Sequence, residues 1–556
     1  MRFFISFLFI TITFCVNAQE SYKSIIAKAI KERDSKSADF DKAFKLYENA
    51  FKKYPDSISQ DDQYWASILA ASLNKKDKAF KYLTPLAKLE KDNSGYPGWE
   101  LVIGKFAKVD YQNLFNDNRW KVLKKQAEIS KKALFNKLLK RENEFYKTKN
   151  TELNTHQNVK SLYKSIKNYN PYLRKKHRDY SLSFKINDST KTSFTIHLPK
   201  NYNPNKKYPV LFFLHGAVRH TSLSEYQIPK TNLGGWNRYY TKYANKNDVI
   251  LVFPKASKKY NWMTSDDGFS MVPEILKQIK TSININDNKV FVSGHSNGAT
   301  GSFSYLMKQP TGFTGFYGFN THPQVYTGGT FIENILNRSF VNFSTDQDYY
   351  YPPNANDSLN KMMKSLHADY KDYRYNGFPH WFPKFNESEP AYKILFADIN
   401  NRIRNPYPKK INWEFDDNNY GNIDWLSNIK LDTLSKKATW NKQLNFKIDK
   451  WLGYNKNDSL ISKKVDIKAF KFPRKSGKII AEYDKNTFKI KTSRIASFSV
   501  NISPEMVNLK KKIKVYVNGK LLFNDKLKFD KKFMLQNFKN TNDRNQIWIN
   551  SINLKI

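Results

Sequence analysis

The chain has 556 residues, of which 40% are hydrophobic and 15% aromatic. A chain this long and this apolar can bury several cores, so a wholly disordered protein is excluded and about three domains are expected. The formal net charge is +44, but the lysines are spread over the whole chain rather than gathered in one stripe. This pattern indicates a compositional bias and predicts no nucleic-acid partner, while acidic polysaccharide or an anionic membrane surface stays open through diffuse charge.

The N-terminus has the pattern of a signal peptide. Residues 1–2 give a short positive region, residues 3–15 form an apolar run, and residues 16–18 offer small side chains at a cleavage site. We predict that residues 1–18 are removed after Ala18 and that the protein is secreted or periplasmic. Lipidation of Cys15 is the alternative, which the bulky Phe14 before it disfavours. No later segment has the ~20 consecutive apolar residues of a transmembrane helix.

Cys15 is the only cysteine. The mature chain is therefore expected to have none, which excludes disulfides, thiolate metal sites and cysteine nucleophiles together. Its domains must be held together by their apolar cores.

Residues 19–150 are predicted to form an all-α domain. The pentapeptide Asp41–Lys45 recurs as Asp77–Lys81, and the interval between the copies resembles that of the tetratricopeptide repeat, about 34 residues. We expect a packing and spacer module in which Trp99 and Trp120 cap a small helical stack. Contact with a protein partner through this domain is the alternative.

Residues 180–404 alternate between short apolar runs and amphipathic stretches, which predicts an α/β fold with a mostly parallel sheet. Nearly every residue of the run 210–214 is apolar, as a sheet covered on both faces requires. The predicted strands are Ser193–His197, Val210–Leu214, Val249–Phe253, Lys289–Ser293 and Phe340–Phe343, and the predicted helices include Val272–Ile283 and Asp357–Tyr370.

Residues 405–556 are predicted to form a small, separate all-β accessory domain with short strands, and we expect a sandwich of two sheets. Asn518-Gly519 between two apolar runs is a strong signal for a tight hairpin. Tryptophans in this region either fill the core or stack on sugars; they are Trp413, Trp425, Trp440, Trp451 and Trp548.

The segment 289–298 carries the most informative motif. An apolar strand runs into Gly294-His295-Ser296-Asn297-Gly298, and a helix-compatible segment follows. This is the G-x-S-x-G pattern between a strand and a helix, the setting in which a sharp turn exposes a serine nucleophile. Glycines are needed there because the backbone at the serine is strained and strand and helix nearly touch. We therefore predict Ser296 as the nucleophile.

The motif resembles the nucleophile elbow of α/β-hydrolases, whose triad runs serine, acid, histidine along the chain. Three histidines follow Ser296. His322 comes before any expected acid strand, and His367 lies in a predicted helix. His380 lies in a proline-flanked loop, residues 377–383, after a strand-like run, and is the predicted base.

The acid is expected after the strand 340–343, where Asp346 and Asp348 both lie. Asp348 is preferred because Pro352 follows it by four residues, a spacing similar to that of the acid loop in the α/β-hydrolases; Asp346 is the alternative. The carboxylate would fix the imidazole tautomer and stabilise the imidazolium without taking the proton.

The oxyanion hole is expected to use the backbone N–H of Asn297 and that of Ala217, in the His215-Gly216-Ala217 loop after a buried strand. His215 is predicted to orient this loop rather than to ionise. The aromatic residues Trp262, Phe378 and Trp381 flank the predicted triad, together with residues 349–351. We predict that they line an acyl or sugar cleft, and packing of the loops is the alternative.

The span 190–385 resembles the secreted feruloyl-esterase and polyhydroxybutyrate-depolymerase branch of the α/β-hydrolases. Ala217 and Ala299 depart from it, standing where many members have glycine. The residues that carry the resemblance are Val210–Gly216, Asn261-Trp262, Gly294–Gly298, Asp348 with Pro352, and Gly377–His380.

This resemblance implies an α/β-hydrolase core at residues 180–404, preceded by the all-α repeat-like domain and followed by the small all-β domain. It implies a serine esterase that cleaves carboxylic esters on carbohydrate-linked substrates through an acyl-enzyme, with no cofactor and no metal. A prolyl-oligopeptidase-like serine peptidase and a non-catalytic carbohydrate- or protein-binding protein are the alternatives.

Overall fold

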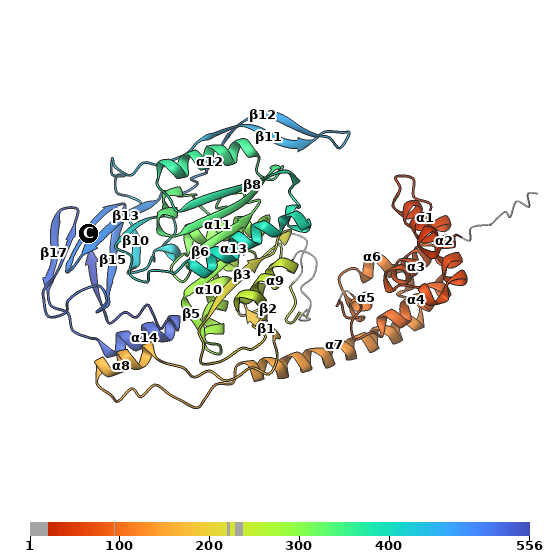
Figure 1. The fold of residues 1–556 in the computed structure, drawn as a ribbon, viewed down its shortest axis with the longest axis horizontal. Helices are drawn as coiled ribbons and strands as arrows, with labels where there is room; N and C mark the ends of the chain where they lie inside the picture. The colour runs from red at the N-terminus through yellow and green to blue at the C-terminus, as the bar shows by residue number, and fades with distance from the viewer. Residues whose placement is uncertain (1–19, 94, 219–222, 228–236) are drawn as a thin grey trace, which may run out of the picture. The chain divides into compact units, whose positions relative to one another are not determined.

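The structure is a computed structural model that describes residues 20–93, 95–218, 223–227 and 237–556 (Figure 1). The predicted signal peptide, residues 1–18, lies outside the described residues. The chain divides into two compact units, residues 1–137 and residues 138–556.

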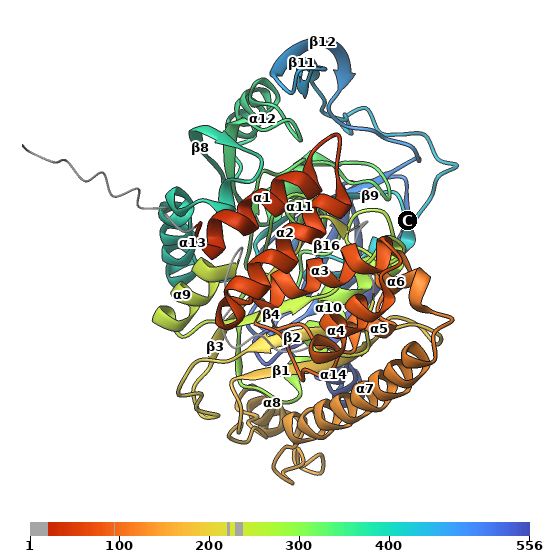
Figure 2. The same ribbon diagram turned by 90° about the vertical axis from the view of Figure 1, so that its right-hand side faces the viewer.

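The N-terminal unit is built from helices that share one apolar core. The helices α2 and α4 begin on the two copies of the repeated pentapeptide, and the equivalent side chains Phe44 and Phe80 are both buried. Figure 2 shows the short helices of this unit gathered together, with the long α7 along one side. The helices are α1 (Tyr22–Asp34), α2 (Phe40–Lys53), α3 (Gln60–Ser72), α4 (Lys76–Ala87), α5 (Glu100–Ile103), α6 (Ala107–Tyr111) and α7 (Asn118–Phe145), of which the last continues into the second unit.

The centre of the second unit is an eight-stranded sheet in the order β1-β2-β4-β3-β5-β6-β7-β8. The strands from β4 through β3 to β8 are parallel to their neighbours, and β1 and β2 add an antiparallel edge. The strands are β1 (Asp179–Lys185), β2 (Lys191–His197), β3 (Tyr208–Leu214), β4 (Ile250–Pro254), β5 (Ile285–Gly294), β6 (Gly315–Phe319), β7 (Ser339–Gln347) and β8 (Tyr370–Pro379).

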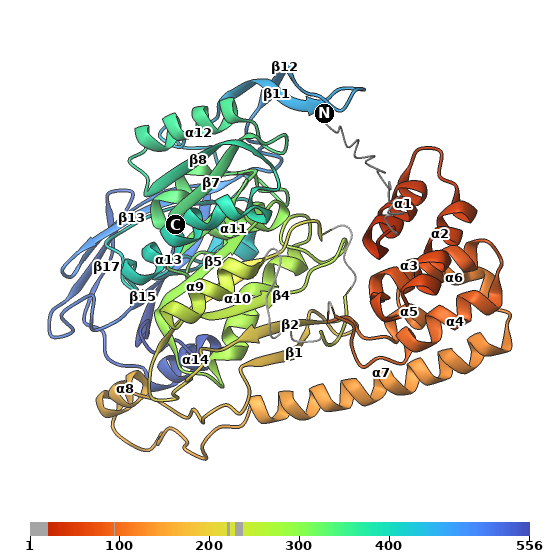
Figure 3. The same ribbon diagram turned by 45° about the vertical axis from the view of Figure 1, so that its right-hand side comes forward.

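Helices cover both faces of this sheet. On one face α9 (Arg238–Asn247) and α13 (Glu389–Asn401) lie against each other and share a core with alternate residues of β3, such as Leu211 and Phe213 (Figure 3). The other face carries α10 (Asp266–Lys280), α11 (Asn297–Lys308) and α12 (Pro353–Ser365), which share a core with Val210 and Phe212. Burial on both faces explains why β3 is almost continuously apolar.

The C-terminal region contains two sheets that enclose one apolar core, with side chains such as Trp413 from one and Val500 from the other. The hairpin of β16 and β17 turns at Asn518 and Gly519, which both have positive φ, as the sequence predicted. One sheet has the order β17-β16-β14-β13-β9 and the other β10-β15-β18. The strands are β9 (Lys410–Phe415), β10 (Leu426–Leu431), β13 (Gly477–Asp484), β14 (Thr487–Ser493), β15 (Ile495–Ile502), β16 (Ile513–Val517), β17 (Lys520–Asp525) and β18 (Asn550–Lys555).

Two further elements make this region different from the separate all-β domain that the sequence predicted. Helix α14 (Lys531–Thr541) packs with α8 (Val159–Lys167), which precedes the eight-stranded sheet. The strands β11 (Lys447–Tyr454) and β12 (Leu460–Lys468) form a hairpin that leaves the two sheets and contacts α12. Residues 138–556 therefore form one compact unit.

Other local predictions also differ from the structure. Neither β1 nor β6 was predicted, because β1 carries alternating serines and β6 has only five residues, two of them glycine. His367 was predicted inside a helix, but α12 ends at Ser365 and His367 adopts a φ of 53° beyond it.

A buried network of charged side chains joins α10 and β5 to the C-terminal region. Lys280 Nζ lies 2.8 Å from Asp287 Oδ1, and Arg544 Nε lies 3.3 Å from Asp287 Oδ2. Arg404 Nη2 lies 2.7 Å from Asp543 Oδ2. Burial raises the pKa of Asp543, but the nearby Arg404 and Lys280 outweigh it and hold this pKa well below its usual range. Lys280 Nζ also lies 3.6 Å from Asp543 Oδ2, so each charged side chain of the network has a partner of opposite charge.

Substitution of Asp287 by alanine should destabilise the second unit strongly, since it leaves Lys280 and Arg544 buried without their carboxylate. We expect a loss of about 3–5 kcal/mol in the free energy of unfolding, measured by urea denaturation with tryptophan fluorescence. Asp188→Ala, which breaks the exposed pair with Lys185, is the control and should change stability little. Equal effects of the two substitutions would contradict the role of the buried network.

Candidate active site

Ser296 lies in the sharp turn between β5 and α11. Its backbone has φ 57° and ψ −122°, and its N–H donates to Phe319 O at 3.1 Å. A Cβ on Gly298 would lie 1.8 Å from Leu214 O, and one on Gly294 would lie 2.3 Å from the Gly298 carbonyl carbon. Only glycine lets strand and helix approach this closely, so the turn presents a partly exposed serine from a strained backbone.

His380 follows β8 and is hydrogen-bonded to Asp348. The Nδ1 atom of His380 lies 2.7 Å from Asp348 Oδ1, and both residues are at most 2% exposed. The carbonyl oxygen of His380 accepts two hydrogen bonds, from His295 Nε2 and from Asn320 Nδ2, both at 2.8 Å. Because His295 is next to Ser296 in the chain, these bonds hold His380 at the elbow.

The two candidate acids have different partners. Asp348 comes directly after β7, and its Oδ1 accepts a hydrogen bond from Tyr350 N at 2.9 Å besides the contact with His380. Asp346 Oδ1 accepts from Gly377 N at 2.8 Å and so joins the ends of β7 and β8. The structure thus brings Asp348 to His380 and uses Asp346 to hold the backbone beside it.

Two other histidines at the site are neutral. Burial, with a smaller effect of the nearby His380, lowers the pKa of His295 to about 3. Burial likewise lowers the pKa of His215 to about 4. The Nε2 atom of His215 accepts from Ala256 N at 3.1 Å, so Nδ1 carries the proton and donates to Gly216 O at 2.8 Å. His215 therefore orients the loop that follows β3.

The loop after β3 lies against the elbow. A Cβ on Gly216 would be 3.1 Å from Ser296 Cβ, and the next residue, Ala217, is exposed with a φ of 50°. Val218 N donates to Asn297 Oδ1 at 3.3 Å, which ties this loop to the first residue of α11. The residues predicted as oxyanion donors, Ala217 and Asn297, thus lie on segments that are in contact beside Ser296.

The side chain of Asn297 makes a second link that sequence reasoning missed. Its Nδ2 donates to the hydroxyl of Tyr350 at 3.1 Å, and this hydroxyl also lies 3.3 Å from Thr300 Oγ1. Asn297 was predicted from its backbone N–H alone. Its amide connects the loop after β3, the elbow helix and the acid loop, which no local sequence pattern could reveal.

The prediction that Trp262 contacts substrate is wrong, because the side chain is fully buried. Its ring packs 4.9 Å from the ring of His215. It also covers Gly301, where a Cβ would lie 2.3 Å from the indole ring. Trp262 is a packing residue beneath the loop after β3.

Phe378 and Trp381 have different surroundings. Phe378 is half-buried and packs against Phe382 and Phe385, at 5.1 and 5.9 Å between ring centroids. Trp381 is 47% exposed, and its ring lies 5.1 Å from that of His380. Of the three aromatic residues predicted to line the cleft, Trp381 is the one that is both exposed and adjacent to His380.

Within the described part of the chain, no group of three or more His, Cys, Asp and Glu side chains is arranged to hold a metal ion. Among the same residues, no helix has the length and apolar character needed to span a membrane.

Comparison with known proteins gives one family match. Residues 187–320 match the family model described as "Putative esterase". The matched segment contains Gly216, Ala217 and the elbow at Ser296, and it ends before Asp348 and His380. No curated protein matches the chain.

Solved structures give weak overall similarity. A thermostable esterase is 21% identical with a TM-score of 0.34, and the alignment covers 41% of this chain and 64% of that one. A "putative dipeptidyl aminopeptidase IV" from Bacteroides ovatus is 14% identical with a TM-score of 0.33, covering 40% and 36%. A ferulic acid esterase is 14% identical with a TM-score of 0.31, covering 40% and 98%. This chain spans less than two thirds of the length of the first two proteins.

The family match and the geometry at Ser296 together support a serine carboxylic ester hydrolase.

Because burial keeps His295 and His215 neutral, neither ring should titrate between pH 8 and pH 5. The measurement is ¹H–¹³C NMR of protein with labelled histidine rings, with His295→Gln and His215→Gln to assign the signals. Titration of His295 near pH 6.5 would contradict the neutral state assigned to it.

Proposed function

We propose that this protein hydrolyses carboxylic esters with Ser296 as nucleophile, His380 as base and Asp348 as the carboxylate that orients His380. One observation carries the proposal. The imidazole of His380 is hydrogen-bonded to Asp348, while its backbone carbonyl is bonded to His295, the neighbour of Ser296. This supports a histidine whose tautomer and position are both fixed beside a strained serine.

The reaction follows from these positions. His380 Nε2 takes the proton of Ser296 Oγ as the oxygen attacks the ester carbonyl, and the N–H groups of Ala217 and Asn297 receive the negative charge of the tetrahedral intermediate. His380 then gives its proton to the departing alcohol, leaving an acyl-serine. A water molecule, deprotonated by His380, attacks the acyl group, and the proton returns to Ser296 as the carboxylic acid leaves. Asp348 stabilises the imidazolium of His380 during both acylation and deacylation.

The substrates we propose are carbohydrate-linked esters, acted on outside the cytoplasm. The signal-peptide pattern of residues 1–18 supports export. The exposed ring of Trp381 beside His380 offers a flat apolar face of the kind that packs on a sugar ring.

The test compares hydrolysis of p-nitrophenyl acetate by residues 19–556 and by three variants. Ser296→Ala should reduce turnover to background, and Asp348→Asn should reduce kcat by about 10⁴, because the histidine tautomer is no longer fixed. Asp346→Asn is the matched control and should retain most of the activity. Equal losses in the two aspartate variants would contradict the assigned acid. Full activity in Ser296→Ala would contradict the nucleophile, and cleavage of peptides rather than esters by the wild type would favour a peptidase.

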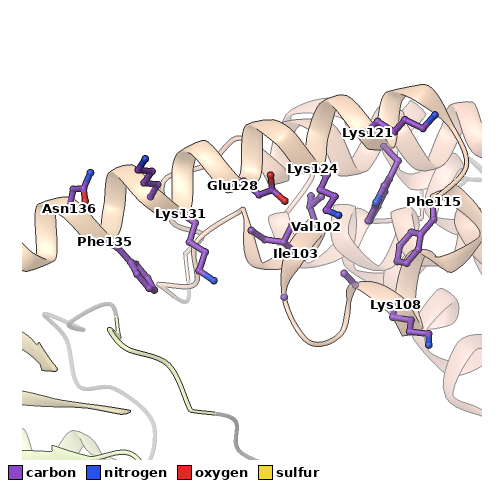
Figure 4. Close-up of a pocket in the computed structure, with 14 residues that line it drawn as sticks. Val102, Ile103, Lys108, Phe115, Lys121, Lys124, Glu128, Lys131, Phe135 and Asn136 are labelled. Atoms are coloured by element: carbon purple, nitrogen blue, oxygen red, sulfur yellow. The ribbon is translucent and has the colours of Figure 1, made fainter. Parts of the chain in front are cut away.

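A second role is favoured by a groove of about 840 Å³ in the N-terminal unit (Figure 4). Its floor is apolar, with Val102 and Ile103 on one side and Phe115 and Phe135 among the residues facing them. Its rim carries one acid, Glu128, and the lysines Lys108, Lys121, Lys124, Lys131 and Lys132. Among the described residues, none of these lysines forms an ion pair with a carboxylate.

This groove supports contact with a protein partner through an acidic amphipathic helix. The wall formed by α7 extends from Trp120 to Asn136, which is about 24 Å at ~1.5 Å per residue. That length matches about four turns of a helix, whose apolar face would cover the floor while its acids meet the lysines.

A sixteen-residue peptide with leucines on one helical face and glutamates on the other should bind this groove. Lys124→Glu should weaken binding about tenfold, since one attraction becomes a repulsion, and fluorescence anisotropy of the labelled peptide measures the change. Lys125→Glu alters an exposed lysine of the same helix outside the groove and is the matched control. The same loss in both variants would indicate diffuse charge attraction and contradict the docking site.

A further inference from the structure

The hairpin of β11 and β12 reaches the candidate active site from the C-terminal region. It forms its own two-stranded sheet and lies along α12, apart from the two sheets of that region (Figures 1 and 3). Asn354 Nδ2 on α12 donates to Asp449 Oδ1 on β11 at 2.9 Å. The hairpin is thus attached to the helix that directly follows the acid loop.

Trp451 anchors the hairpin on the acid loop itself. Its indole Nε1 donates to Tyr349 O at 3.0 Å, and Tyr349 is the residue after Asp348. The indole ring also packs against His322 and Tyr351, with ring centroids 5.9 and 6.1 Å away. Burial lowers the pKa of His322 to about 4, so this packing is apolar and carries no charge.

Tyr454, at the end of β11, continues the aromatic surface that begins at the catalytic histidine. Its ring contacts the ring of Tyr349 edge-on at 5.6 Å, and Tyr349 in turn lies 5.5 Å from the ring of His380. Tyr454 is 48% exposed, much like Trp381 on His380. Trp381 thus contacts His380 directly, whereas Tyr454 reaches it through Tyr349.

We propose that the β11–β12 hairpin is a wall of the substrate site and that Tyr454 binds a sugar ring of the ester. This inference rests on the proposed esterase function and names the part of the chain that selects the alcohol group of the substrate. An edge-on pair leaves a face of the Tyr454 ring uncovered by Tyr349, and an uncovered aromatic face packs well on the C–H face of a pyranose. Trp451 is a positioning residue, because it acts through Tyr349.

The test compares two esters with the same acyl group, glucose pentaacetate and ethyl acetate, in a pH-stat assay. In Tyr454→Ala the ratio of kcat/KM for the sugar ester to kcat/KM for ethyl acetate should fall about tenfold, mainly through KM. Tyr454→Phe keeps the ring and should keep the ratio. Ile461→Ala changes an exposed apolar residue on the paired strand and is the matched control.

An unchanged ratio in Tyr454→Ala would overturn the proposal, as would an equal fall in Ile461→Ala. Binding of glucose pentaacetate to Ser296→Ala protein, by calorimetry, separates this inference from the esterase function. The wild type could cleave neither ester while Tyr454→Ala still weakens binding. That result would support the sugar-binding role of Tyr454 and contradict the esterase function. If binding is unaffected by Tyr454→Ala, the wall is wrong whatever the activity.

Discussion

The close approach of three backbone segments around Ser296 is the constraint on which the site depends. The end of β5, the start of α11 and the loop after β3 meet where Gly294, Gly298 and Gly216 have no side chains. Any Cβ at Gly298 would overlap Leu214 O, so the helix could not begin where it does. The strained backbone of Ser296 persists because β5 lies inside the parallel sheet and the Ser296 N–H is bonded to Phe319 O.

The other residues of the candidate active site lie at the carboxyl ends of the same parallel strands. The carboxyl ends of parallel strands lie side by side, so the residues that follow β5, β6, β7 and β8 meet there. His295 and Asn320 bind the carbonyl of His380, and Asp348 binds its ring. Because His295 is neutral, it positions His380 without adding a charge that would oppose the imidazolium of the proposed reaction.

The sheet-rich C-terminal region and the eight-stranded sheet belong to one compact unit. It has its own apolar core, yet its residues Asp543 and Arg544 enter a buried ionic network with Lys280 at the end of α10, Asp287 of β5 and Arg404. Separating the two parts would leave these buried charges without partners, so the ion pairs oppose that separation. The hairpin that carries Trp451 extends the contact to the acid loop.

Local patterns were enough to predict Ser296 and its elbow, the runs that became β2, β3, β4, β5 and β7, and the turn at Asn518-Gly519. Each of these depends on neighbours within a few residues, such as apolar periodicity or the need for glycine. The sequence left Asp346 and Asp348 as alternatives, because both follow the same strand. It also placed Trp262 at the substrate, because the sequence does not show whether that side chain is buried.

The sequence by itself was enough to predict a serine nucleophile, because a serine in a glycine-flanked turn between strand and helix is a local feature. Only the tertiary structure decided which carboxylate meets His380, that Trp262 is core, and that β11 reaches the acid loop from a hundred residues away. Those outcomes depend on which strand ends and loops share one place in space. Such proximity arises only when the whole chain packs, so it cannot be predicted from any short segment.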